Sequence, residues 1–392
     1  MNPNTQLNLD SRPVTNFERV KATLYEYTPE IDSFEDTIYP AADVKKDLRQ
    51  LSDYKKTKEY QSALDQDTRS KIMEQTFIEH SGKSDWFGDE DLYGEDEAYY
   101  QTVIVPTSEV DDYFNHVDAI AVFKNRATDQ TPLPVALDFT YNVPGMNHKM
   151  SWRHVYGKKQ TAPAELSEFG DSYIGPDKRT GETGLHTRRL PERFSYGLKI
   201  PGFATAKYFE DTDSFDDPIL PKGRIPLMPR FIVGYEADEN TVDTLYGGTP
   251  DSAFRRNYGQ QEFEKRRAEF SKVERHAKWC SLIELNEQSK NLVAYLDNLT
   301  PEETQFIPPR LLQDAKQQAA TAAAYFGNAF KNAKAKLDDP STPDRSAEQA
   351  AYASALSDEV CQSIISESQN VFLHRYDRTS AQSSGHKLRK LY

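Results

Sequence analysis

Cysteine is scarce in this sequence, with only Cys280 and Cys361 in 392 residues. The two lie far apart and have no close histidine partner, so their spacing speaks against a cysteine-based zinc site. So low a cysteine content is typical of a reducing compartment, and we expect a cytoplasmic protein.

Long apolar segments are missing as well. No run reaches the roughly 18 apolar residues of a membrane-spanning helix, so we expect no membrane association. The first residues, MNPNTQLNLDSRPVTNF, lack the basic and then apolar pattern of a secretory signal. Walker sequences, dinucleotide fingerprints and HExxH are absent, and GDSYIG lies outside the strand-turn-helix context of a hydrolase serine.

Basic residues are few in the first third of the chain. Residues 1–120 hold 12 Lys and Arg against 26 Asp and Glu, whereas the remaining residues hold 36 of each. The net charge of -14 therefore belongs to the N-terminal third. Because a neutral body can still carry basic faces, this charge excludes neither a nucleic acid nor a protein partner.

Helix-forming and strand-forming stretches follow one another in blocks. Residues 43–80 contain no Gly or Pro and predict two helices. Short runs rich in Val, Ile and Phe predict strands at QTVIVP, VDAIAVF, PVALDFTYN, FSYGLKIPGFATAKYF and RIPLMPRFIVGYE. From about residue 251 the composition is helical, with a last helix around 346–375. The order of these blocks predicts an α+β fold, with a small mixed sheet, flanking helices and helical N- and C-terminal regions.

Three regions are expected from this pattern. They are an N-terminal arm with helices (1–69), an α+β core (70–250) with a surface insertion (160–194), and a helical C-terminal region (251–392).

Two adjoining predicted strands each carry one aspartate. In PVALDFTYN, side-chain alternation directs Asp138 and Thr140 to the same face, and in VDAIAVF Asp118 shares its face with Ile120 and Val122. A carboxylate among apolar neighbours is costly to desolvate unless it is paired, hydrogen-bonded or bound to a metal. A hard cation would offset the repulsion between two such groups. Alternatively, Asp118 lies at a strand end in water and caps a turn. The neighbouring Asp111 and Asp112 are expected to accept backbone amides.

The order of helix, acidic strand, acidic strand, helix and strand resembles the core of the PD-(D/E)XK nuclease superfamily. The matching pieces are VPTSEVDDYFNHVDAIAVF and PVALDFTYN, and the later TAKYF and IPLMPRFIVGYE are similar to uncharacterised bacterial proteins with this core. The resemblance covers roughly residues 70–245 and implies a restriction-endonuclease-like core.

The resemblance also implies a metal site. Asp118 and Asp138 would be ligands of Mg²⁺ or Mn²⁺, and a metal held there would polarise a phosphate and make hydroxide available from bound water. A glutamate of the upstream helix often completes such a site, and both Glu79 and Glu74 qualify.

The lysine of the superfamily would fall at Thr140 in this sequence, which is a departure from the pattern. Lys149 is the natural substitute, because it lies on the helix predicted over 146–159, directly after the strand of Asp138. If no lysine reaches the site, the core would bind without cutting.

A nuclease also needs cations for the phosphate backbone. The predicted helix 146–159 and the insertion supply them at Lys158, Lys159, Arg179, Arg188 and Arg189. A second basic group follows residue 251, but it is interleaved with glutamates, and ion pairing within the helix accounts for it.

Two functions therefore stay open. One is a metal-dependent phosphodiesterase acting on DNA or RNA. The other is a non-catalytic interaction or structural protein that binds a protein partner through its acidic N-terminal third or its C-terminal helices. They differ in whether the carboxylates of Asp118 and Asp138 come within about 4–6 Å, close enough to share one cation.

Overall fold

The structure is a computed structural model, and it describes part of the 392 residues. The described residues are 28–57, 74, 77–78, 86, 100–115, 117–125, 132–143, 172–176, 183–187, 200, 202–210, 220–237, 241, 244, 252–304 and 307–373.

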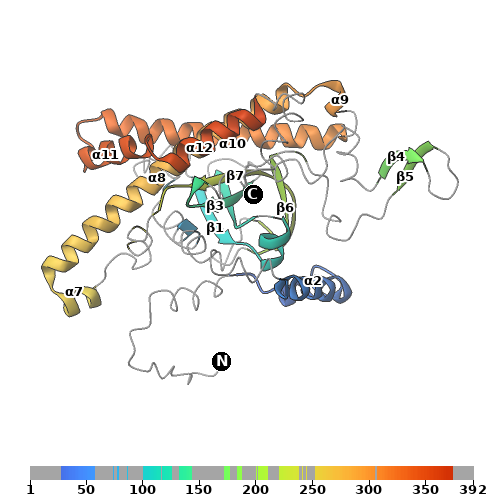
Figure 1. The fold of residues 1–392 in the computed structure, drawn as a ribbon, viewed down its shortest axis with the longest axis horizontal. Coiled ribbons are helices and arrows are strands. Elements are labelled where there is room, and N and C mark those ends of the chain that lie inside the picture. The colour runs from blue at the N-terminus through green and yellow to red at the C-terminus, as the bar shows by residue number, and fades with distance from the viewer. Residues whose placement is uncertain are drawn as a thin grey trace, which may run out of the picture.

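A five-stranded mixed sheet forms the centre of the described structure (Figure 1). Its strands, in spatial order, are β1 (Tyr100–Pro106), β2 (Ala119–Asn125), β3 (Leu133–Thr140), β7 (Gly223–Gly234) and β6 (Phe203–Phe209). The first three run antiparallel to one another, β3 and β7 are parallel, and β6 returns antiparallel to β7. The predicted α+β class and mixed sheet are therefore confirmed.

Helices make up most of the rest. They are η1 (Ile31–Phe34), α2 (Ala41–Lys55), the π-helical η2 (Asp111–Asn115), α7 (Ser252–Tyr258), α8 (Gln260–Asp297), α9 (Pro301–Thr304), α10 (Pro309–Asp338), α11 (Arg345–Ala355) and α12 (Glu359–Phe372). No described helix is both long enough and apolar enough to cross a membrane.

Two sequence expectations differ from the structure. The single last helix expected around 346–375 is wrong, because α11 and α12 are separate helices. The break has a local cause: Asp358 has extended backbone angles, and its side chain accepts the Cys361 N–H at 2.9 Å as an N-cap. Within the expected surface insertion, β4 (Ser172–Pro176) and β5 (Thr183–Thr187) form a two-stranded antiparallel sheet.

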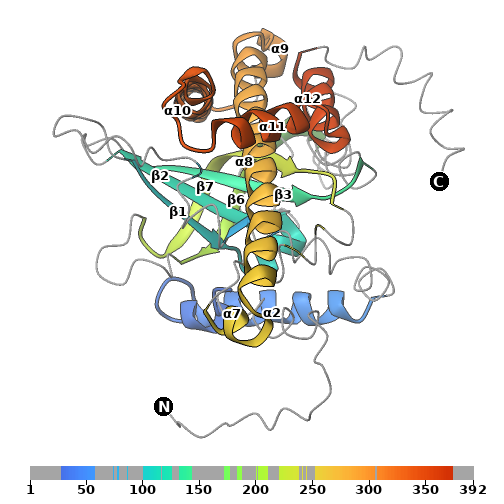
Figure 2. The same cartoon turned by 90° about the vertical axis from the view of Figure 1, so that its left-hand side faces the viewer.

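The C-terminal helices cover one face of the sheet, and α2 lies on the opposite side (Figures 1 and 2). Side-chain alternation along the strands produces the two faces, since Val135 and Leu137 belong to the core shared with α8 and α10, whereas Ala136 packs on the other face. Aromatic contacts join strand to helix in the first core, as between Phe231 and Phe326, whose ring centroids are 5.8 Å apart. The boundary expected at residue 251 stays a prediction, but the helices beyond it share a core with the sheet.

A buried polar network holds α2 against β6. Lys207 of β6 forms an ion pair with Asp47 of α2 at 2.5 Å, and the Tyr208 hydroxyl donates to the same carboxylate at 2.6 Å. Asp111 of η2 accepts the backbone N–H groups of Lys207 and Tyr208 at 2.7 and 2.9 Å. The expectation that Asp111 accepts backbone amides is thus met. Burial raises the pKa of its carboxyl group, and these hydrogen bonds offset only part of that rise.

β6 pairs with β7 only as far as Pro229. Beyond Pro229, side chains of α8 bind the backbone groups along that edge of β7. The Ile232 N–H donates to Gln288 Oε1 at 3.0 Å, and the Gln288 amide donates back to the Ile232 carbonyl oxygen at 2.6 Å. Two residues on, the Gly234 N–H donates to Glu284 Oε2 at 3.0 Å. Because an edge strand exposes one such set of groups every second residue, α8 replaces the missing neighbour strand.

Candidate functional site

The two strand aspartates lie at the same end of neighbouring strands. Ala119 of β2 pairs with Leu137 of β3, so Asp118 and Asp138 are each one residue beyond that pair. The Phe139 N–H donates to Asp118 Oδ2 at 2.7 Å, which fixes the Asp118 carboxylate beside the backbone of β3. Asp118 is therefore at a strand end, as the capping alternative held, but it is only 8% exposed rather than surrounded by water.

A cation from β7 lies next to the Asp138 carboxylate. Arg230 forms an ion pair with Asp138 Oδ2, and both side chains are buried. A buried carboxylate needs such a partner, because an uncompensated charge in the interior is strongly destabilising. Nothing in the sequence identified Arg230, because β3 and β7 are far apart in the sequence and become neighbours only through a parallel crossover. We call Asp118, Asp138 and Arg230 the strand-end cluster.

Of the other residues proposed for the metal site, Glu74 and Thr140 are described. Glu74 is buried, and Phe77, three positions further on, contacts Phe139, with ring centroids 4.7 Å apart. Phe77 therefore packs against β3. Thr140 is also buried, and its hydroxyl donates to the Asn142 carbonyl oxygen at 3.2 Å.

The remaining predicted site residues lie outside the described residues. They are Glu79, Lys149, Lys158, Lys159, Arg179, Arg188 and Arg189.

Chemically, the strand-end cluster combines two carboxylates with a guanidinium group. Carboxylate oxygens are the ligands that Mg²⁺ and Mn²⁺ prefer, and a guanidinium binds phosphate oxygens through paired hydrogen bonds. The cluster contains the donor types that a phosphodiesterase needs.

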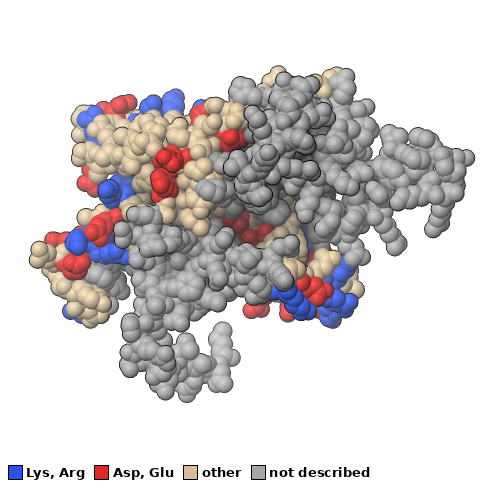
Figure 3. Space-filling view, in the orientation of Figure 1, with Lys and Arg blue, Asp and Glu red and all other residues tan. Residues whose placement is uncertain are grey.

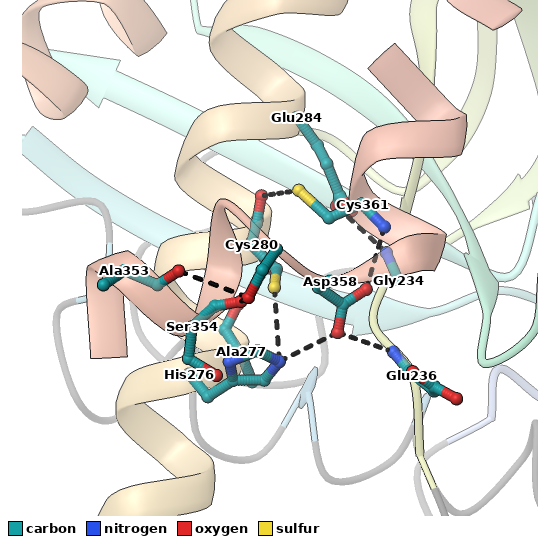
Figure 4. Close-up of polar contacts among 12 residues, drawn as sticks. Gly234, Glu236, His276, Ala277, Cys280, Glu284, Ala353, Ser354, Asp358 and Cys361 are labelled. Atoms are coloured by element: carbon teal, nitrogen blue, oxygen red, sulfur yellow. Dashed lines mark hydrogen bonds and ion pairs between the residues drawn. The ribbon is translucent and has the colours of Figure 1, made fainter. Parts of the chain in front are cut away.

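A second polar cluster joins α8, α12 and the end of β7 (Figure 4). His276 and Cys280 lie four residues apart on α8, so they share one side of that helix, and Asp358 approaches from the N-terminus of α12. His276 Nε2 is 2.9 Å from Asp358 Oδ2 and 3.6 Å from Cys280 Sγ. Asp358 Oδ2 also accepts the Glu236 N–H at 2.9 Å. Just past β7, a side chain from a helix thus again binds a backbone N–H group, as Gln288 and Glu284 do along β7. We call His276, Cys280 and Asp358 the helix-junction cluster.

Burial and hydrogen bonding shift the pKa values at this junction in opposite directions. Burial acts to raise the pKa of Asp358, but hydrogen bonds from His276 and from the Cys361 and Glu236 N–H groups outweigh it and lower the pKa below the ordinary value. Burial raises the pKa of the Cys280 thiol, and the nearby Cys361 raises it further. Burial also raises the pKa of Glu284 well above its usual range.

The helix-junction cluster contains the three residue types of a Cys-His-Asp catalytic triad, but its geometry is different. In a triad the nucleophile and the aspartate contact the two different ring nitrogens of the histidine. Here both Cys280 and Asp358 contact Nε2. Cys280 is also fully buried, and its raised pKa keeps the thiol protonated rather than nucleophilic. Nucleophilic catalysis by Cys280 is therefore not supported.

The expectation that the cysteines have no close histidine partner is wrong, because His276 lies beside Cys280 in the fold. The HxxxC spacing on a predicted helix was the available signal, since residues four apart share a helix face. No comparable signal pointed to Asp358, which is 82 positions from His276. The cysteines themselves are separated in sequence but adjacent in space, with Cys361 Sγ 3.9 Å from the Cys280 carbonyl oxygen.

The charged helix after the core has the mixed surface expected from its sequence. Figure 3 shows basic and acidic side chains intermingled over α7 and the first half of α8. Lys265 and Glu262, and likewise Arg266 and Glu269, approach to 4.0 Å within α8. These pairs support ion pairing as the reason for this basic group.

The fold and both clusters can be compared with known proteins. No protein-family model, curated protein or solved structure matches this chain. Functional interpretation therefore rests on the geometry of the chain's own residues.

Proposed function

We propose that this protein is a metal-dependent phosphodiesterase that acts on DNA or RNA, with Mg²⁺ or Mn²⁺ as its cofactor. One observation carries the proposal: two buried carboxylates, Asp118 and Asp138, lie at the same end of adjoining strands, with a guanidinium group beside Asp138.

Asp118 and Asp138 would hold the divalent ion through their carboxylate oxygens. The bound ion would supply an activated water and polarise the phosphate. Arg230 balances the charge of Asp138, and its guanidinium is also suited to orient a phosphate oxygen by charge-assisted hydrogen bonds. A glutamate, Glu74 or Glu79, and Lys149 complete the proposed site.

Nucleic-acid binding is proposed for the basic residues Lys158, Lys159, Arg179, Arg188 and Arg189. Their contacts to the backbone would make binding weaken steeply with salt, because each neutralised phosphate releases counterions.

Cleavage of single- and double-stranded DNA and RNA with Mg²⁺ or Mn²⁺ is the direct test. Asp138→Asn and Asp118→Asn should each abolish cleavage, and the chelated wild type should be inactive. Asp53→Asn is the matched control, because Asp53 is an exposed aspartate of α2, and it should cleave like the wild type. Metal-dependent cleavage that persists in both strand-end variants, with their folding confirmed by circular dichroism, would reject the role of the cluster.

The alternative is a non-catalytic interaction protein built on a nuclease-like core. It is favoured by one specific observation, the ion pair that already compensates the charge of Asp138 without a metal. The wild type would then show no cleavage and no Mn²⁺ binding, and Arg230→Gln would destabilise the fold without changing any activity.

A further inference from the structure

We propose that His276, Cys280 and Asp358 form a zinc-binding site at the junction of α8 and α12, separate from the strand-end cluster. The three side chains offer one nitrogen, one sulfur and one oxygen ligand atom, all within 4.8 Å of one another. Zinc binds this combination of donors, whereas Mg²⁺ and Ca²⁺ prefer oxygen alone.

The distances fit a tetrahedral ion. With Zn–S of about 2.3 Å, Zn–N of about 2.1 Å and Zn–O of about 2.0 Å, ligand atoms in a tetrahedral site are separated by about 3.4 to 3.6 Å. The Cys280 Sγ to His276 Nε2 distance is 3.6 Å, and the Nε2 to Asp358 Oδ2 distance is 2.9 Å. Zinc binding therefore requires the Asp358 oxygen to move away from the imidazole and toward Cys280 Sγ, from which it is no more than 4.8 Å distant.

The carboxylate and the thiol both contact the same ring nitrogen, Nε2. Nε2 must carry a proton to face the Asp358 carboxylate at 2.9 Å, and it then cannot accept a hydrogen bond from the Cys280 thiol. If Nε2 is unprotonated, it faces the carboxylate with one lone pair against another. Among the described residues His276 Nδ1 has no hydrogen-bond partner either, so all polar contacts of the ring are made at Nε2. A zinc ion bound by Nε2, the thiolate and the carboxylate satisfies all three groups, with the thiol proton released to solvent and the ring proton moved from Nε2 to Nδ1.

The cluster has the support and the access that a metal site needs. The backbone N–H groups of Glu236 and Cys361 donate to the two oxygens of Asp358 and fix its orientation. The His276 side chain is 18% exposed, which gives an ion a route from solvent, whereas Cys280 and Asp358 are buried behind it. Cys361 is not one of the three ligands: in Figure 4 its sulfur points toward the Cys280 carbonyl oxygen and away from His276.

The experiment is a titration of the full-length, chelator-treated protein with Co²⁺ followed by displacement with Zn²⁺. The wild type should bind one Co²⁺ with the near-ultraviolet absorption of a thiolate–cobalt bond, and Zn²⁺ should remove that absorption. Cys280→Ser should lose the band, and His276→Gln should weaken binding by more than about a hundredfold. Cys361→Ser is the matched control, because it replaces a buried cysteine of the same junction and should retain the band.

His276→Gln keeps the outcome decisive if Cys280→Ser fails to fold, because His276 is the most exposed of the three residues. The absence of a thiolate band in the wild type would overturn the site. So would a band that survives in His276→Gln, or one that is lost in Cys361→Ser while Cys280→Ser keeps it. Since none of these readouts depends on nucleic-acid cleavage, the result is independent of the proposed function.

Discussion

The strand-end cluster and the helix-junction cluster are both buried and both contain aspartate, but they compensate its charge differently. In the first, Arg230 provides a full positive charge for Asp138, and a backbone N–H donates a hydrogen bond to the Asp118 carboxylate. In the second, Asp358 has hydrogen bonds from two backbone N–H groups and from one imidazole nitrogen that a thiol also contacts.

This difference indicates what each cluster can bind. Two carboxylates with a guanidinium suit a hard cation and a phosphate, and they are stable without either because the ion pair is internal. A histidine nitrogen that contacts both a thiol and a carboxylate offers, with them, the mixed nitrogen, sulfur and oxygen donors that suit a borderline metal. β7 connects the two, since Arg230 lies on it and Glu236 follows it.

The largest expected effect comes from breaking the ion pair of the strand-end cluster. Asp138→Ala leaves the Arg230 guanidinium buried without its carboxylate, and it should lower the free energy of unfolding by about 3 to 5 kcal/mol. The double variant Asp138→Leu with Arg230→Met should regain most of that loss, because it removes both charges. Urea denaturation measures both. A double variant that is no more stable than Asp138→Ala would contradict the internal compensation proposed for this cluster.

An intermediate effect is expected where α8 completes the edge of β7 between the clusters. Gln288→Ala leaves the Ile232 N–H and carbonyl groups buried without partners and should cost about 2 to 4 kcal/mol. Gln313→Ala removes an exposed glutamine from α10, and it should change stability by less than about 0.5 kcal/mol. Equal losses in the two variants, measured by the same denaturation, would show that the edge does not depend on the Gln288 side chain.

The smallest expected effect depends on pH. Because burial raises the pKa of Glu284, the folded state retains a proton that the unfolded state releases, and stability falls as pH rises above the ordinary range of a glutamate toward the raised pKa. Glu284→Gln needs no proton and can still accept the Gly234 N–H through its amide oxygen. It should match the wild type within about 1 kcal/mol near pH 5 and become relatively more stable as pH rises. Thermal melting of both proteins from pH 5 to 9 checks this, and a constant difference would show that Glu284 does not titrate with an altered pKa.

Sequence alone was sufficient for the five strands of the central sheet, but not for β4 and β5, and it was sufficient for the position of the two aspartates. Period-two alternation separated Val135 and Leu137 from Ala136, and the same signal identified Asp138 as a polar residue among buried neighbours. It could not identify Arg230, because Arg230 becomes a neighbour of β3 only through a long parallel crossover. Asp358 was out of reach for the same reason, since it meets His276 only when α12 packs on α8. Local patterns report local structure, whereas both clusters are completed by contacts between distant segments.

The central claim is that Asp118 and Asp138 together hold one hard cation, and calorimetric titration with Mn²⁺ tests it most directly. Wild type, Asp53→Asn and His276→Gln should each bind Mn²⁺ alike, because neither Asp53 nor His276 belongs to the strand-end cluster. Asp118→Asn, with its fold verified by circular dichroism, should bind at least about tenfold more weakly. An isotherm for Asp118→Asn that is indistinguishable from the wild-type isotherm, or the absence of Mn²⁺ binding by the wild type, would contradict the claim.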